Sequence, residues 1–259
     1  MFKKLLATFG VGSAKVDTHL ERSSFFPGEE IRGVTHVVGG DLTQTIDDIY
    51  INLVTRYLKE VNDSTHRINH NLTTTKIASS FSIQPNETRS FPFSLWLPYD
   101  TPLTMYNHPV YLQTGLDIKM AIDPSDKDSI EVKPLPLMQS IFNGMQMLGF
   151  QFRKADCEYS RRLARNYPFV QEFEFKPNYG SSYQGRVDEV EVVFWVDTPE
   201  QMQVILEVDR RGRGLKGIFT EAFDMDERKV HIQTSGQDLH QPTDYWAKAL
   251  SDAINMGLR

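Results

Sequence analysis

Hydrophobic and polar residues alternate along most of the first half of the chain. The alternating segments are residues 16–20, 31–37, 49–57, 77–83, 91–97 and 110–122. A period of two places successive side chains on opposite faces of a strand, so each segment predicts a half-buried strand. Short strands separated by glycine and proline turns are typical of an all-β sandwich. No helical pattern interrupts residues 15–133, which excludes a doubly wound α/β fold.

The pattern changes after residue 133 and then returns. Pro134 and Pro136 end the strands, and the hydrophobic residues of 137–148 follow helical spacing, which predicts a short amphipathic helix. Alternation resumes afterwards. The later strands are expected at residues 169–175, 187–196, 202–208, 215–219 and 230–234.

The chain ends in a second predicted helix. Trp246, Leu250 and Ile254 lie four residues apart and form one hydrophobic stripe. This stripe must be buried, either by docking on the chain's own second lobe or in a homodimer, and the pattern leaves both open.

These elements predict an all-β protein with two sandwich lobes, a short helix between them and a C-terminal helix. The expected boundaries are residues 1–133 for the first lobe, 134–148 for the linker and helix, 149–236 for the second lobe and 237–259 for the last helix.

Composition and charge bear on whether the chain binds nucleic acid or spans a membrane. The chain has 259 residues, 40% of them hydrophobic, and a net charge of −6. An acidic chain without a basic module gives no reason to expect nucleic acid as a ligand. No hydrophobic run approaches the ~20 residues that span a bilayer, so an integral membrane segment is not expected.

Two features bear on the compartment. The single cysteine, Cys157, cannot form an internal disulfide, which fits a cytoplasmic location. Residues 1–10 place two lysines before a hydrophobic run, as a signal peptide does, but the run is short and interrupted by glycine. We therefore expect an N-terminal segment that packs on the fold.

Few residues suggest catalysis or metal binding. His66 and His70 have the spacing of a helical metal pair, but they lie in a polar stretch, residues 62–71, that we expect to be an exposed loop. Arg161 and Arg162 follow Cys157 and would lower its pKa if they fold close to it. No phosphate loop, dinucleotide fingerprint or nucleophile elbow is present, so no cofactor is expected.

A basic cluster is the main candidate for partner binding. The cluster comprises Arg210, Arg211, Arg213 and Lys216, at a predicted hairpin turn. Guanidinium groups pair well with carboxylates and phosphates, so the cluster could contact an acidic or phosphorylated partner. The alternative is that these charges are simply solvated.

Two stretches resemble motifs of arrestin-fold proteins. The sequence FFPGEEIRGV at residues 25–34 resembles a signature near the start of arrestin-fold N-terminal domains, and FPFSLWLPYDTP at 91–102 resembles their later strand and turn. Their order and spacing within a β pattern favour an arrestin-like scaffold for both lobes.

A closer resemblance is to the SpoOM sporulation-control family. It rests on MFKKLLA at residues 1–7, GSAKVDT at 12–18 and TGLDIKMAIDP at 114–124. The resemblance implies a cytoplasmic, non-catalytic regulatory protein, or adaptor, that controls sporulation through other proteins, and it supplies no ligand site. The alternative from the residues alone is a β-sandwich metalloprotein or enzyme that uses His66 and His70 or Cys157.

Overall fold

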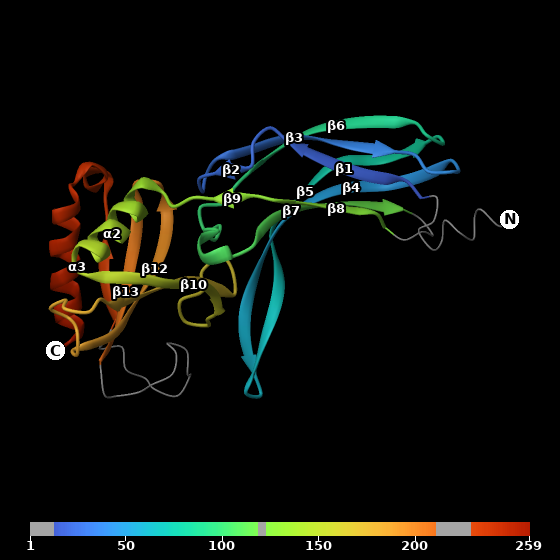
Figure 1. The fold of residues 1–259 in the computed structure, drawn as a ribbon. Helices are drawn as coiled ribbons and strands as arrows, with labels where there is room; N and C mark the ends of the chain where they lie inside the picture. Colours follow the sequence, from blue (N-terminus) through green and yellow to red (C-terminus); the bar gives the residue numbers. More distant parts are fainter. Residues whose placement is uncertain (1–12, 119–122, 211–228) are drawn as a thin grey trace. The chain divides into compact units, whose positions relative to one another are not determined.

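The computed structural model describes residues 13–118, 123–210 and 229–259 (Figure 1). These residues are mostly in strands, with two α-helices, which confirms the predicted all-β class. The chain forms two compact units: Met1–Arg56, Asn69–Thr104 and Pro109–Val132 make the first, and Tyr57–Ile68, Met105–His108 and Lys133–Arg259 make the second. The boundaries expected at residues 133, 148 and 236 remain predictions.

The first unit contains two antiparallel sheets. One has the strand order β1-β3-β6, and the other has β5-β4-β7-β8. The strands are β1 (Lys15–Leu20), β3 (Glu30–Val38), β4 (Gln44–Val61), β5 (Ser64–Ile83), β6 (Thr88–Trp96), β7 (Val110–Ile118) and β8 (Ser125–Ser129). A parallel pair, β2 (Ser24–Phe25) and β9 (Glu131–Val132), also belongs to this unit. The 3₁₀ turn η1 (Met105–Asn107) belongs to the second unit.

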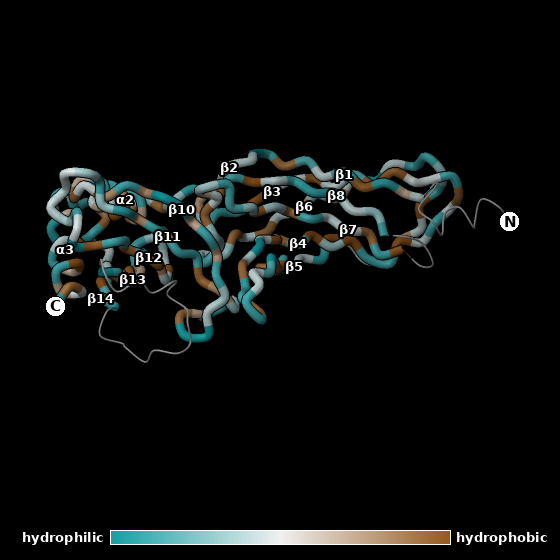
Figure 2. The backbone as a smooth tube through the Cα atoms, turned by 60° about the horizontal axis from the view of Figure 1, so that its bottom comes forward, coloured by the Kyte–Doolittle hydropathy of each residue, from teal (hydrophilic) through white to brown (hydrophobic). Residues whose placement is uncertain are grey.

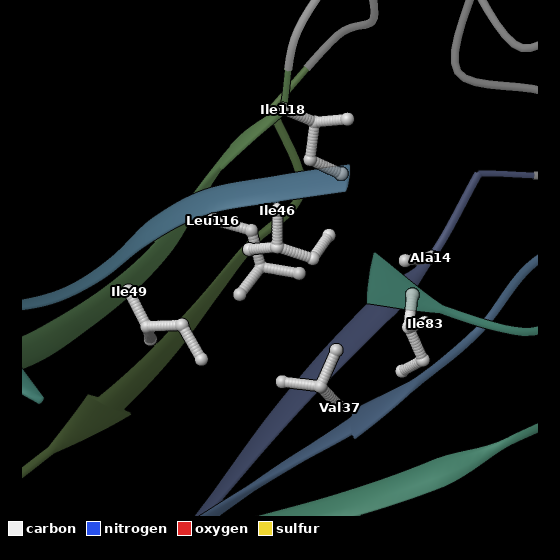
Figure 3. Packing of buried hydrophobic residues seen from close by; sticks show 7 residues of the cluster. All are labelled: Ala14, Val37, Ile46, Ile49, Ile83, Leu116 and Ile118. Atoms are coloured by element: carbon white, nitrogen blue, oxygen red, sulfur yellow. The ribbon is translucent and has the colours of Figure 1, made fainter. Parts of the chain in front are cut away.

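Hydrophobic side chains from both sheets form the core of the first unit. Figure 3 shows Val37, Ile46, Ile83 and Leu116 gathered in one cluster, and all four are at most 1% exposed. Alternation produces most of this packing, because every second side chain of a regular strand faces inward. In β4 a register shift between Ile46 and Asp48 brings both Ile46 and Ile49 into the core.

Buried hydroxyls cross the first unit beside this core. Thr18 Oγ1 lies 3.1 Å from Thr35 Oγ1 and 2.8 Å from Thr114 Oγ1, which links β1 to β3 and to β7. All three threonines are at most 2% exposed. The hydroxyls satisfy one another, as buried polar groups must.

The hairpin of β4 and β5 corrects the expected loop at residues 62–71. Only Asn62 and Asp63 form the turn, with φ of 50° and 59°, and β5 begins at Ser64. Asparagine and aspartate tolerate this left-handed conformation, which two-residue hairpin turns require. The expected loop was wrong because polar residues on an exposed hairpin do not show the alternation that marks a half-buried strand.

The second unit contains an antiparallel sheet with the order β14-β13-β12-β11-β10. Its elements are α2 (Pro136–Met147), β10 (Phe150–Tyr159), β11 (Phe169–Pro177), β12 (Val187–Thr198), β13 (Gln201–Arg210), β14 (Lys229–Gln233), the 3₁₀ turn η3 (Gly236–His240) and α3 (Thr243–Gly257). The end of the β4–β5 hairpin joins this unit, where Tyr57 stacks on Phe169 at 5.1 Å and Leu58 pairs with Glu158.

Helices α2 and α3 pack together over one face of this sheet (Figure 1). The ring of Phe142 on α2 lies 5.1 Å from Phe173 and 5.5 Å from Phe194. Between the helices, a Cβ at Gly144 would lie 2.9 Å from Leu250, so glycine permits the close approach. Within the described residues of this unit, helices take the place that a second sheet has in a sandwich. Neither of these two helices is long and apolar enough to cross a bilayer.

Hydrophobic and hydrophilic positions are interleaved along the strands of both units (Figure 2). In the second unit, Phe173 and Phe175 face the helices, whereas Glu172 and Glu174 face the other way. The sheet therefore has a helix-covered face and an opposite face that carries its charged residues.

Candidate functional site

The predicted basic cluster is described only at Arg210. This residue ends β13, and its Nη2 donates a hydrogen bond to the Gly257 carbonyl at the end of α3, at 3.4 Å. A cation is favourable there because the carbonyls of a helix C-terminus carry partial negative charge. Arg211, Arg213 and Lys216 lie outside the described residues, so their role as a partner site remains a prediction.

The predicted stripe of the C-terminal helix is buried within its own unit. Trp246, Leu250 and Ile254 are 1%, 0% and 0% exposed. Trp246 and Leu250 lie against Gly144 of α2. The stripe thus faces the chain's own second unit. Of the two arrangements considered, docking on the same chain and contact in a homodimer, this is the first.

The geometry of His66 and His70 does not suit a shared metal ion. Both lie on β5 rather than in a loop, and residues four apart on a strand are separated by roughly 13 Å. Zinc needs its ligand atoms at about 2 Å, so one ion cannot bind both side chains. In the part of the chain that the structure describes, no group of three or more His, Cys, Asp or Glu could hold a metal ion.

Cys157 is a buried thiol with a histidine beside it. Its side chain is 1% exposed, and Sγ lies 3.4 Å from Nε2 of His108. Burial, reinforced by the Glu172 carboxylate, raises the pKa of the thiol well above its usual value. A lowering of this pKa was conditional on Arg161 and Arg162 folding close to the thiol; the pKa is instead raised, because desolvation dominates at a buried strand position.

The most unusual electrostatics lie on the face of the second sheet opposite the helices. We call this surface the acidic face and define it by Glu158, Glu172, Glu174, Glu189, Glu191 and Glu207. The sheet register places Glu174 directly opposite Glu191, and Glu191 directly opposite Glu207. Three carboxyl groups therefore stand in one row on three adjacent strands, an arrangement in which like charges repel.

Lysines flank this row at both ends. Lys154 on β10 pairs in register with Glu174, and its Nζ lies 3.6 Å from a carboxylate oxygen of Glu174. At the other end, Lys229 on β14 pairs with Glu207 at 3.8 Å. Glu191, at the centre of the row, makes no ion pair among the described residues. Lys176 on β11 also lies 3.3 Å from carboxylate oxygens of Glu174 and Glu189, so Glu191 is the member of the row that lacks an ion pair within the described residues.

The central carboxyl groups are protonated more readily than ordinary ones. Burial raises the pKa of Glu191 to about 9, and the neighbouring Glu189 and Glu207 carboxylates add to this. Burial and then the Glu158 carboxylate raise the pKa of Glu172 well above its usual range. Oε1 of Glu172 is buried and has no hydrogen-bond partner among the described residues. Strongly perturbed carboxyl groups gather at functional sites more often than elsewhere.

Sequence reasoning missed the acidic face. The signal was present, because glutamates alternate with phenylalanine or valine at residues 172–175 and 189–192. That alternation assigns the glutamates to one side of each strand. Only strand order and register bring Glu174, Glu191 and Glu207 into one row.

Three comparisons with known proteins point to the same family. A family model described as SpoOM protein matches residues 2–212. The chain is 42% identical over 238 residues to the sporulation-control protein spo0M of Bacillus subtilis (strain 168), and the match covers 92% of each protein. The crystal structure of Spo0M, sporulation control protein, from Bacillus subtilis matches with a TM-score of 0.88 and 39% identity, over 95% of this chain and 100% of that one.

Proposed function

This chain belongs to the SpoOM family, as its motifs predicted, and from that premise we propose that it regulates sporulation by contacting other proteins. The likeness to a sporulation-control protein covers 92% of both sequences, so it supports a regulatory role for the whole chain. Contact with partners is the finer part of the proposal and rests on the surface of the second unit.

The row of Glu174, Glu191 and Glu207 carries the proposal. Like charges directly opposite one another on adjacent strands destabilise a sheet, so folding alone gives no reason to place these three carboxyl groups in one row. A basic segment of a partner would supply the cations that the centre of this row lacks. Charged surfaces of this kind increase association rates and select partners of opposite charge.

Binding of a basic segment should be coupled to loss of protons from the acidic face. A partner cation beside Glu191 stabilises the ionised carboxylate and lowers a pKa that stands at about 9 in the free protein. Partner affinity is therefore expected to increase from pH 6 toward pH 9 and to decrease with salt.

The residues considered for catalysis support a non-catalytic regulator. His66 and His70 are too far apart on β5 to share a metal ion, and the pKa of Cys157 is raised by burial, which disfavours the reactive thiolate. We accordingly propose a cytoplasmic regulator, or adaptor, on an arrestin-like scaffold. A homodimer and a contribution of Arg211, Arg213 and Lys216 to partner contact remain part of this proposal.

Complementation of a deletion strain tests the proposal. Cells lacking the gene would receive the wild-type chain, the Glu174→Gln/Glu207→Gln double variant or the control Asp188→Asn. Asp188 is exposed and belongs to β12, the same strand as Glu191. Partners would be captured from sporulating cells and spores counted. We expect the double variant alone to lose a salt-sensitive partner and to alter spore numbers.

Two results would count against the proposal. Unchanged spore formation after deletion of the gene would remove the regulatory role. Equal recovery of the same partners by wild type and double variant would show that the acidic face is not the contact surface. The variant Arg211→Ala/Arg213→Ala, used in the same partner capture, tests the predicted basic contact separately.

A further inference from the structure

An open pocket of about 500 Å³ lies on the helix-covered side of the second sheet. Its floor includes Phe142 and Phe152, whose rings each lie within 6 Å of the Phe175 ring. This volume is within the range of roughly 300–1,000 Å³ that ligand pockets occupy. The pocket is on the face of the sheet opposite to the acidic face and is formed by different residues.

Carboxamide side chains line the rim of this pocket. They are Gln139, Asn143, Gln146, Gln151 and Asn178. All five residues are exposed, and Gln139 Nε2 donates to Asn143 Oδ1 at 2.9 Å. Each carboxamide offers both donors and acceptors, the same groups that a peptide bond presents. The described lining carries no charged side chain, so nothing there selects an anion or a cation.

The edge of the sheet beside this pocket has little strand pairing. Phe150, Gln151 and Phe152, at the start of β10, line the pocket. On one side, β10 pairs with β11 along its length, whereas on the other its pairing within the described residues is limited to Glu158 with Leu58. Incompletely paired strand edges are common attachment points for extended peptides.

Large hydrophobic side chains are exposed next to the lining residues. Tyr106, Met147 and Tyr179 are 61%, 59% and 96% exposed, and each directly follows a lining residue in sequence. The Tyr106 ring lies 6.4 Å from the Phe152 ring of the floor. Exposed tyrosine and methionine of this kind are enriched in the core of protein interfaces.

We propose that this pocket, which we call the amide pocket, binds an extended, uncharged segment of a partner protein. One large apolar side chain of the segment occupies the phenylalanine floor. The carboxamides of the rim bond to the peptide groups on either side of that side chain. The proposal rests on the proposed function in that the ligand is a protein, but it uses a surface other than the acidic face.

A random heptapeptide library displayed on phage and panned on the full chain provides the test. We expect enriched peptides to share one large apolar residue with uncharged neighbours. A synthetic enriched peptide would then be measured by fluorescence anisotropy against Asn143→Ala/Gln146→Ala and the control Asp252→Ala. Positions 143, 146 and 252 are all exposed on helices, so neither variant should affect folding. Loss of two hydrogen bonds is expected to weaken binding about tenfold.

The outcomes separate this site from the acidic face. Binding that is weakened by the amide variant, but unchanged by Glu174→Gln/Glu207→Gln and by salt, supports the amide pocket. Enrichment of basic peptides that bind through Glu174 and Glu207 overturns it while leaving the proposed function intact. Failure to enrich any peptide, or equal affinity for Asn143→Ala/Gln146→Ala and Asp252→Ala, also overturns it.

Discussion

Replacing Glu191 with glutamine should change how the stability of the protein depends on pH. In the folded chain Glu191 has a pKa of about 9, raised from 4.5 chiefly by burial. Between those values the folded chain keeps the proton that the unfolded chain has lost. Raising the pH therefore favours unfolding, and the stability associated with this group falls from pH 4.5 until pH 9. Glutamine cannot ionise, so the variant lacks this loss.

The expected magnitude follows from the linkage between pKa and stability. Each pH unit in this window lowers the free energy of unfolding of the wild type by about 1.4 kcal/mol through Glu191 alone. From pH 5.5 to pH 7.5, the stability of Glu191→Gln relative to wild type should therefore rise by about 3 kcal/mol. Glu172 also has a raised pKa, and the Glu191 carboxylate contributes to it. The difference between the two proteins, rather than the slope of either, therefore reports the removal of Glu191 together with its effect on Glu172.

Denaturation in urea at pH 5.5, 6.5 and 7.5, at constant ionic strength, measures this difference. Tryptophan fluorescence is a suitable signal, because one of the three tryptophans, Trp195, is on the same strand as Glu191. Asp188→Asn, at an exposed position of that strand, is the matched control and should remain parallel to wild type. A stability difference between Glu191→Gln and wild type that stays constant across the three pH values would refute the reasoning.

Three further predictions concern packing and reactivity. Thr114→Val leaves the Thr18 hydroxyl without one of its two buried partners. Urea denaturation should show that this variant lowers the free energy of unfolding by about 1–3 kcal/mol. The control Thr74→Val, which removes an exposed hydrogen bond, should change the free energy of unfolding little. Gly144→Ala places a Cβ 2.9 Å from Leu250 and 3.2 Å from the Ala247 backbone nitrogen. This crowding should lower the midpoint of thermal unfolding, although alanine has the better helix propensity. The control Gly115→Ala, whose Cβ would lie in open space, should not lower the midpoint. The Cys157 thiol should react with a disulfide reagent at pH 8 only after unfolding in guanidinium chloride, because it is 1% exposed and its pKa is raised; a fast reaction of the native protein would contradict its burial.

Local patterns predicted much of the secondary structure. The alternating segment at 31–37 lies within β3, and the segment at 91–97 extends one residue beyond β6. The helical spacing after Pro136 corresponds to α2. The prediction of a loop at residues 62–71 was wrong, because these polar residues lie at the exposed end of the long β4–β5 hairpin. Hydrophobic and polar residues alternate only where one face of a strand is buried. A strand that is exposed on both faces therefore does not show this alternation.

The surface sites depended on contacts that sequence patterns do not contain. The sequence placed glutamates on one side of β11, β12 and β13, but register aligned Glu174, Glu191 and Glu207 and so produced the pKa shift at the centre of the row. The amide pocket likewise combines carboxamides of α2 with phenylalanines of β10 and β11.

The sequence by itself determined many of the strands, the two helices and the family, because period, turn residues and motifs are local properties of the chain. Tertiary structure decided where the helices packed, that Trp246 would be buried within its own unit, and that Cys157 would lie beside His108. It also decided which carboxyl groups lost their solvent. The physical reason is that desolvation and charge repulsion depend on distances between residues that are remote in the sequence, and only the folded chain fixes those distances.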